Sequence, residues 1–255
     1  MSVLRRKRAI AEGFHRYCRR LLSQRFDGVA LLADCAPAWV ALGETPRALL
    51  YSSHASWWDV IVGGYLALAC KLELYAPMDI DQLSKYWILR SVGIFGVSET
   101  KPIGYLRALR EIFEVSDTRS LLITPQAHFA TNHLPSPPFR RGLTLAAERY
   151  PKVPLFAVTM HYDLWNESRP VVLLGVTELD RTALAECSTS EERERFLRLE
   201  LDTLTARVVA TSHHRDDSEW NWLIRSKART LGLQDITGRI RAAVHGERYH
   251  SGHLR

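Results

Sequence analysis

Apolar positions along the chain repeat with two different periods, one typical of buried strands and one typical of helices. Short apolar runs predict strands at residues 47–52, 72–77, 120–125, 153–162 and 169–179. Helical spacing predicts helices at residues 57–70, 81–90, 101–115, 142–149 and 191–211. Because strands alternate with helices, we expect an α/β fold, with a mixed, mostly parallel sheet covered by helices.

Two further segments complete the predicted organisation. Residues 29–41 are mostly apolar and predict a second short helix near the N-terminus, whereas residues 126–141 have no period and contain three prolines, which predicts a loop. We therefore divide the chain into basic, membrane-associating helices at 1–44, an α/β domain at 45–225 and a polar, loosely ordered tail at 226–255.

The first 25 residues predict a basic amphipathic helix. Its apolar stripe is formed by Ile10, Phe14, Tyr17 and Leu21, with Cys18 and Leu22 beside it. Eight lysines and arginines stand against one glutamate, a net charge of +7, whereas the 26 basic and 27 acidic residues of the remainder nearly cancel. Such a helix is typical of one lying on an anionic membrane, and equally of one packed on its own domain.

Composition and charge exclude several other classes. No run of about 18 apolar residues is present, so we expect peripheral attachment at the cytoplasmic face of a membrane and no spanning segment. The near-neutral remainder offers no basic groove, so nucleic acid is not an expected partner. The four scattered cysteines contain no C-x-x-C pair, and the loop histidines His128 and His133 have no partner ligand nearby, so we expect no metal site.

The stretch "YSSHASWWDV" holds the candidate chemistry. His54 and Asp59 are five residues apart and would diverge on one continuous helix, but they can meet if His54 lies in the loop and Asp59 in the first helical turn. With Ser56 as the N-cap, Asp59 would fall at the third helical position, so its role could be capping alone. The functional alternative is a general base, His54, oriented by a carboxylate.

No protein nucleophile accompanies this pair. The sequence has no G-x-S-x-G elbow, and no cysteine stands next to a base. A base without a nucleophile favours direct attack by a substrate hydroxyl on an activated acyl group, such as a thioester.

At this point the chain resembles the glycerolipid and lysophospholipid acyltransferases, which include the 1-acylglycerol-3-phosphate acyltransferases. "HASWWD" resembles their H-x-x-x-x-D block, and "VGIFGVSETKPIGYLRAL", "LLITPQAHF", "PFRRGLTLAAER" and "KVPLFAVT" resemble the later blocks in family order, over about residues 45–180. The resemblance implies phospholipid biosynthesis by transfer of a fatty acyl group from acyl-CoA or acyl carrier protein to a lipid hydroxyl, with no cofactor. It also implies catalytic roles for His54 and Asp59.

Further site residues follow from the same resemblance. The blocks imply substrate binding by Gly93, Phe95, Pro125, Gln126, Ala127, Arg140 and Arg141. Two blocks depart from the family pattern: the second ends in Ser98-Glu99 instead of an arginine, and the third has Gln126, Ala127 and Phe129 in place of a glutamate, a glycine and an arginine. We therefore expect an acceptor without a phosphate group. The alternative is a non-catalytic lipid-binding or scaffold protein that retains the fold.

Overall fold

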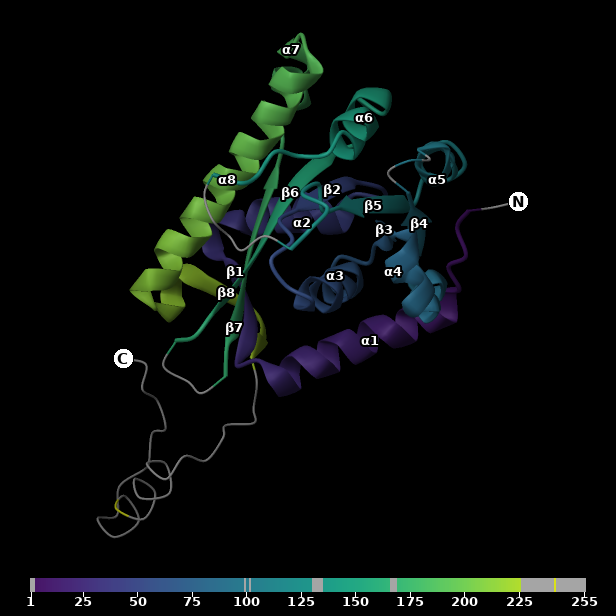
Figure 1. Ribbon diagram of the computed structural model, residues 1–255. Helices are drawn as coiled ribbons and strands as arrows, with labels where there is room; N and C mark the ends of the chain where they lie inside the picture. Colours follow the sequence, from purple (N-terminus) through teal and green to yellow (C-terminus); the bar gives the residue numbers. More distant parts are fainter. Residues whose placement is uncertain are drawn as a thin grey trace.

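The computed structural model describes residues 3–98, 100, 102–129, 135–165, 169–225 and 241. Its centre is an eight-stranded sheet with the strand order β4-β3-β5-β2-β6-β7-β1-β8 (Figure 1). The strands are β1 (Gly28–Leu32), β2 (Leu49–Ser52), β3 (Glu73–Asp79), β4 (Ile94–Val97), β5 (Arg119–Ile123), β6 (Leu155–Asp163), β7 (Val171–Glu178) and β8 (Trp220–Arg225).

The sheet is mixed and mostly parallel, which confirms the predicted fold class. Strands β4, β3, β5, β2 and β6 are parallel to one another, β7 is antiparallel to β6, β1 is parallel to β7, and β8 is antiparallel to β1. Of the six inner strands, β1, β2, β5, β6 and β7 are largely buried, as expected of strands covered on both faces, whereas β3 is only partly buried.

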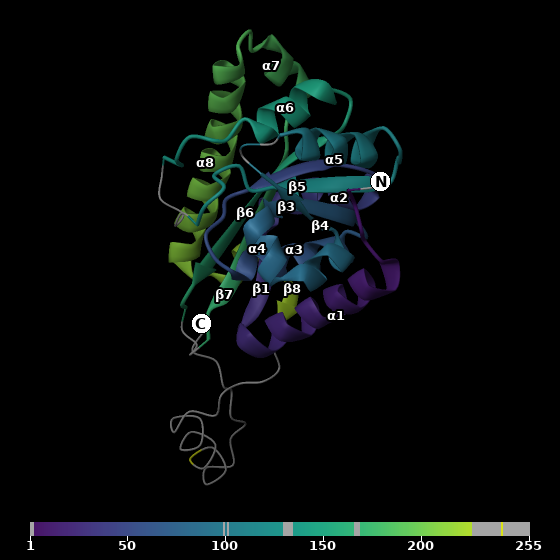
Figure 2. The same cartoon turned by 45° about the vertical axis from the view of Figure 1, so that its right-hand side comes forward.

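Helices cover both faces of this sheet. They are α1 (Arg8–Arg25), α2 (Ala36–Glu44), α3 (Trp58–Ala69), α4 (Ile80–Lys85), α5 (Ile103–Phe113), α6 (Gly142–Arg149), α7 (Arg181–Glu186) and α8 (Ser190–His214), with 3₁₀ turns η1 (Ala33–Cys35), η2 (Trp87–Val92) and η3 (Asp217–Glu219). In both views α1 and α3 lie on one side of the sheet, and α5, α6 and α8 lie on the other (Figures 1 and 2).

The sequence prediction fails at the start of the domain. Residues 29–41, predicted as one helix, form strand β1, turn η1 and most of helix α2. Pro37 lies in the first turn of α2, where its missing N–H is not needed, so it marks the true start of the helix. The predicted helix at 81–90 is divided into α4 and η2. The predicted C-terminal tail at 226–255 lies outside the described residues except for position 241.

Helix α1 is packed on the domain. Its buried face is formed by Ala11, His15, Cys18 and Leu22, whereas Ile10 and Tyr17 of the predicted stripe are exposed. The contact with α3 is close, because a Cβ at Gly64 would lie 2.7 Å from Cys18 Sγ. The apolar face of the helix is therefore wider than the predicted stripe, and only one side of that face packs against the core.

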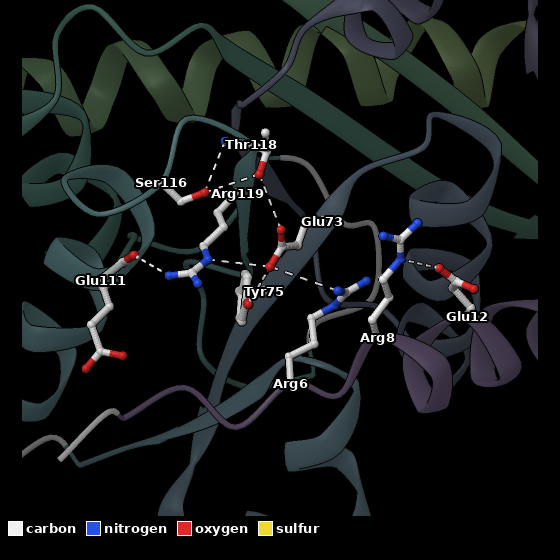
Figure 3. Close-up of polar contacts among 9 residues, drawn as sticks. All are labelled: Arg6, Arg8, Glu12, Glu73, Tyr75, Glu111, Ser116, Thr118 and Arg119. Carbon is white, nitrogen blue, oxygen red and sulfur yellow. Dashed lines mark hydrogen bonds and ion pairs between the residues drawn. The ribbon is translucent and has the colours of Figure 1, made fainter.

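The segment before α1 is held by carboxylates (Figure 3). The Glu111 side chain accepts hydrogen bonds from the backbone N–H groups of Val3 and Leu4. Arg6 lies 3.9 Å from the Glu73 carboxylate, which also accepts a hydrogen bond from Tyr75. The basic N-terminal segment is thus connected to β3 and α5. Among the residues that the structure describes, none of the helices combines the length and apolar character needed to cross a bilayer.

Candidate functional site

His54 lies in the loop between β2 and α3, and its ring meets Asp59 in the first turn of α3. His54 Nδ1 is 2.9 Å from Asp59 Oδ2. The side chain of Asp59 is only 4% exposed, whereas that of His54 is 22% exposed. The predicted proximity of the two side chains is confirmed. A buried carboxylate at Nδ1 favours the tautomer with its proton on Nδ1, which leaves the lone pair of Nε2 for a substrate.

Asp59 also organises the start of α3. Its Oδ2 accepts the backbone N–H of Ser56 at 3.0 Å, and Ser56 Oγ accepts the N–H of Trp58 at 3.2 Å. The helix begins at Trp58 with Trp57 as its N-cap, so the predicted N-cap at Ser56 is wrong by one position. The same oxygen thus bonds both the loop backbone and the imidazole. One carboxylate therefore stabilises the start of the helix and orients His54.

Tyr162 is a member of this site that sequence reasoning missed. Its hydroxyl donates to the second oxygen of Asp59, Oδ1, at 2.6 Å. Strand β6 pairs with β2 up to Ser52–Val158 and then continues to Asp163, which carries Tyr162 past the end of β2. Burial and the charge of Asp59 raise the pKa of Tyr162 far above its ordinary value, so the phenol stays protonated and donates.

Gln126 connects the third block of the sequence to the loop that carries His54. Its side chain is buried, and its Oε1 accepts the backbone N–H of His54 at 2.8 Å. The turn that carries it is tight: Ala127 has φ of 58° and donates its N–H to the Thr124 carbonyl. The neighbouring Pro125 carbonyl accepts the N–H of Arg140 at 2.7 Å. An uncharged amide oxygen is therefore sufficient to hold His54 in place.

The exposed edge of His54 is bordered by Phe129. The two ring centroids are 4.4 Å apart with an interplanar angle of 35°. Phe129 is 58% exposed, so it forms an apolar wall between the imidazole and solvent. Within the described part of the chain, Nε2 of His54 has no hydrogen-bond partner.

The topology of the sheet places this site where α/β folds bind ligands. Strands β2 and β5 are parallel neighbours, and His54 and Gln126 follow their carboxyl ends. The chain leaves β2 for α3 on one face and leaves β5 for α6 on the other (Figures 1 and 2). Adjacent strands whose connections diverge in this way define a topological switch point, the usual ligand site of open α/β sheets.

Two predicted substrate-binding residues are not brought to His54. Gly93 precedes β4, at the amino end of the parallel strands, and β3 and β5 separate β4 from β2. Its φ is 115°, and a Cβ there would lie 2.5 Å from the Leu74 carbonyl oxygen, so the backbone itself requires glycine. Phe95 is buried in the core. The structure gives both residues a packing role.

The two predicted arginines lie closer to the site. Arg140 and Arg141 are exposed, and Arg141 is the N-cap of α6. The backbone of Arg140 is bonded to Pro125, one residue before Gln126. Glu99 and His133 lie outside the described residues. Among those described, no three histidine, cysteine or acidic side chains converge as a metal site would require.

No protein-family model matches the sequence, and no curated protein matches it.

Proposed function

We propose that this protein is an acyltransferase that moves a fatty acyl group from an acyl thioester, acyl-CoA or acyl carrier protein, to a hydroxyl of a lipid acceptor. The observation that carries the proposal is the hydrogen-bonded pair of His54 and Asp59 at the carboxyl edge of the sheet. A partly exposed imidazole backed by a buried carboxylate is the arrangement that general-base catalysis requires. The ordered acyltransferase-like blocks support the same reaction class.

The reaction needs only one protein base. Nε2 of His54 takes the proton from the acceptor hydroxyl as its oxygen attacks the thioester carbonyl carbon. The new C–O bond gives a tetrahedral intermediate, which collapses with cleavage of the C–S bond. The proton on His54 then passes to the leaving thiolate, so the products are an ester and a free thiol, and the histidine returns to its neutral form.

Asp59 and Tyr162 act on the base and not on the substrate. The Asp59 carboxylate stabilises the imidazolium that forms during proton transfer and fixes the tautomer. The Tyr162 hydroxyl holds the other carboxylate oxygen, so the carboxylate cannot rotate away from His54. Gln126 accepts the backbone N–H of His54, so the residue is held both at its backbone and at Nδ1 of its ring.

The surroundings of the base favour an acceptor with a neutral hydroxyl. Phe129 lies against His54, at a position where the acyltransferase block that the sequence resembles has an arginine. A phosphate monoester requires convergent cations because charge-assisted hydrogen bonds must offset its desolvation. The nearest predicted candidates are Arg140 and Arg141, at the edge of the site. We propose a bulky apolar acceptor at the cytoplasmic face of a membrane.

A direct test is to incubate the purified chain with a long-chain acyl-CoA and a panel of hydroxylated lipids. Thiol release and a new ester detected by mass spectrometry are the expected result. Thiol release that never exceeds the enzyme-free rate, with acyl-CoA and with acyl carrier protein alike, would contradict the proposal.

The second candidate function is non-catalytic lipid binding. The Phe129 ring against His54 and the uncharged Gln126 favour it, because both differ from the acyltransferase pattern. It predicts saturable binding of a fluorescent lipid with no product, and binding that survives His54→Ala. Turnover in the first assay would exclude it.

A further inference from the structure

A group of exposed apolar side chains lies beside the His54 loop. The aromatic rim, as we call it, consists of Trp57, Tyr86, Trp87 and Ile88, whose residues are 45% to 69% exposed. The rings of Trp57 and Tyr86 are in contact, with centroids 5.3 Å apart, so the start of α3 and the junction of α4 with η2 form one surface. Large apolar groups gathered in one exposed patch mark an interaction surface.

The basic helix is packed next to this rim. Helix α1 contacts η2, and the N–H of Lys7 donates to the Ser91 carbonyl at 2.9 Å. Seven cationic side chains of α1 and of the segment just before it are exposed: Arg5, Lys7, Arg8, Arg16, Arg19, Arg20 and Arg25. The single acid in this part of the chain, Glu12, is already paired with Arg8. Positive charge is therefore concentrated beside the aromatic rim.

We propose that the aromatic rim and the exposed cations of α1 together dock on an anionic lipid bilayer. Tryptophan and tyrosine side chains prefer the interface between headgroups and acyl chains, and arginines attract anionic headgroups. A protein partner would also accept the apolar groups. The charge pattern favours a membrane, because the first 25 residues carry a net charge of +7 and the remainder of the chain a net charge of −1.

Docking in this way orients the candidate site. Trp57 is three residues after His54, so a rim seated in the headgroup region brings the catalytic loop to the membrane. This last step rests on the proposed acyl transfer, since it supplies the lipid acceptor to the base. The docking itself requires no chemistry.

Helix α1 docks without leaving the domain. Its buried residues Cys18 and Leu22 belong to the main core, while Tyr17 and the arginines stay exposed. Deleting the helix would therefore remove part of the core as well as the charge. Surface substitutions test the proposal without that loss.

The test is vesicle flotation of the full chain, with phosphatidylcholine alone and with about 30% phosphatidylglycerol. The rim variant is Trp87→Ala with Ile88→Ala, and the charge variant is Arg16→Gln, Arg19→Gln and Arg20→Gln. The control is Leu199→Ala, since Leu199 is 61% exposed on α8, on the opposite side of the sheet. We expect each test variant to bind anionic vesicles at least about tenfold more weakly, the control to bind like the parent, and high salt to mimic the charge variant.

Quenching by brominated lipids provides a second measurement on the same surface. The tryptophan fluorescence of the parent should be quenched when it binds anionic vesicles that contain brominated lipids. The double variant Trp57→Phe with Trp87→Phe should lose most of this quenching. Parental binding and quenching by all variants would overturn the proposal. So would a parental dimer that the rim variant dissociates while vesicle binding is unchanged, because the rim would then join two copies. Vesicle binding is measured without acyl donor or acceptor. A chain that has no acyl-transfer activity but still floats with vesicles would therefore contradict the proposed acyl transfer and leave the docking proposal standing.

Discussion

Asp59 is the residue on which the separate parts of the candidate site converge. Its two oxygens accept hydrogen bonds from the Ser56 backbone and the Tyr162 hydroxyl, and Oδ2 also meets His54. His54 and Ser56 belong to the loop between β2 and α3, Tyr162 belongs to β6, and Asp59 itself belongs to α3, so the position of the imidazole depends on all three parts together.

Tyr162→Phe tests whether the phenol positions the catalytic pair. We expect kcat to fall about tenfold with little change in KM, because the variant loses one charge-assisted hydrogen bond to Asp59 without touching substrate. The measurement is steady-state kinetics across pH. As a control, Tyr105→Phe removes a tyrosine hydroxyl that bonds the Gly142 carbonyl. Equal effects of the two substitutions on kcat would remove Tyr162 from the site.

Individual residues of the site differ in how far sequence could predict them. His54 and Asp59 are five residues apart, so loop-then-helix geometry was enough to bring them together. Tyr162 is 103 residues from Asp59, and its position depends on how far β6 extends past β2. Gln126 was assigned to substrate, but its amide oxygen accepts the N–H of His54. Local sequence patterns do not predict contacts between residues that lie far apart in the chain and meet across a sheet.

At the scale of elements, helices α1 and α3 pack so closely that Gly64 leaves no room for a side chain. Gly64→Ala should lower the free energy of unfolding by about 1–3 kcal/mol, because its Cβ would lie 2.7 Å from Cys18 Sγ. Gly63→Ala on the same helix is the matched control, since its nearest neighbour is a flexible Leu122 methyl at 3.4 Å, and it should be neutral or stabilising. Urea denaturation measures both. Identical free energies for the two variants would contradict this packing.

His15, in the buried face of α1, makes stability depend on pH. Burial and, secondarily, the charge of Arg6 lower its pKa from 6.5 to about 4, so the unfolded chain binds its proton first as the pH falls. The contribution of neutral His15 to the free energy of unfolding is complete above pH 6.5 and is lost as the pH falls toward about 4. Between pH 7 and pH 5 the free energy of unfolding of the parent should fall by about 1–2 kcal/mol more than that of His15→Leu. Parallel losses in urea titrations at the two pH values would contradict the assignment.

Local pattern predicted most elements but not the edge of the sheet. Residues 29–41 form one apolar run, and neither period nor length separates strand β1 from the helix that follows. Strand β8 alternates only weakly and follows a long helix, so nothing in the sequence predicted that it pairs with β1. Its partner lies nearly 200 residues earlier, and such pairing is fixed by the whole fold.

At the scale of the whole molecule, the alternation of strands and helices was sufficient to predict the α/β class. The strand order was not predictable, although it creates the switch point between β2 and β5 that carries His54 and Gln126. The sequence also left open whether α1 is packed or membrane-bound. The structure shows the helix packed, with its cations still exposed.

Acceptor choice is a property of the whole site. In a competition with one acyl donor, we expect kcat/KM for bulky neutral hydroxylated lipids to exceed that for lysophosphatidic acid by about tenfold or more, because an apolar ring, Phe129, lies against His54 where a phosphate would need a cation. Preference for lysophosphatidic acid that Arg140→Ala abolishes would show instead that an arginine at the edge of the site binds phosphate.

The central claim is that His54 is the general base, and one comparison tests it most directly. His54→Ala and His214→Ala each remove a histidine whose Nδ1 contacts an acidic side chain five residues later, but His214 lies at the exposed end of α8. Acyl-transfer rates of the two folded variants should differ by about 10²–10⁴, with His54→Ala the slower and His214→Ala equal to the parent. Turnover by His54→Ala at the parental rate would contradict the mechanism.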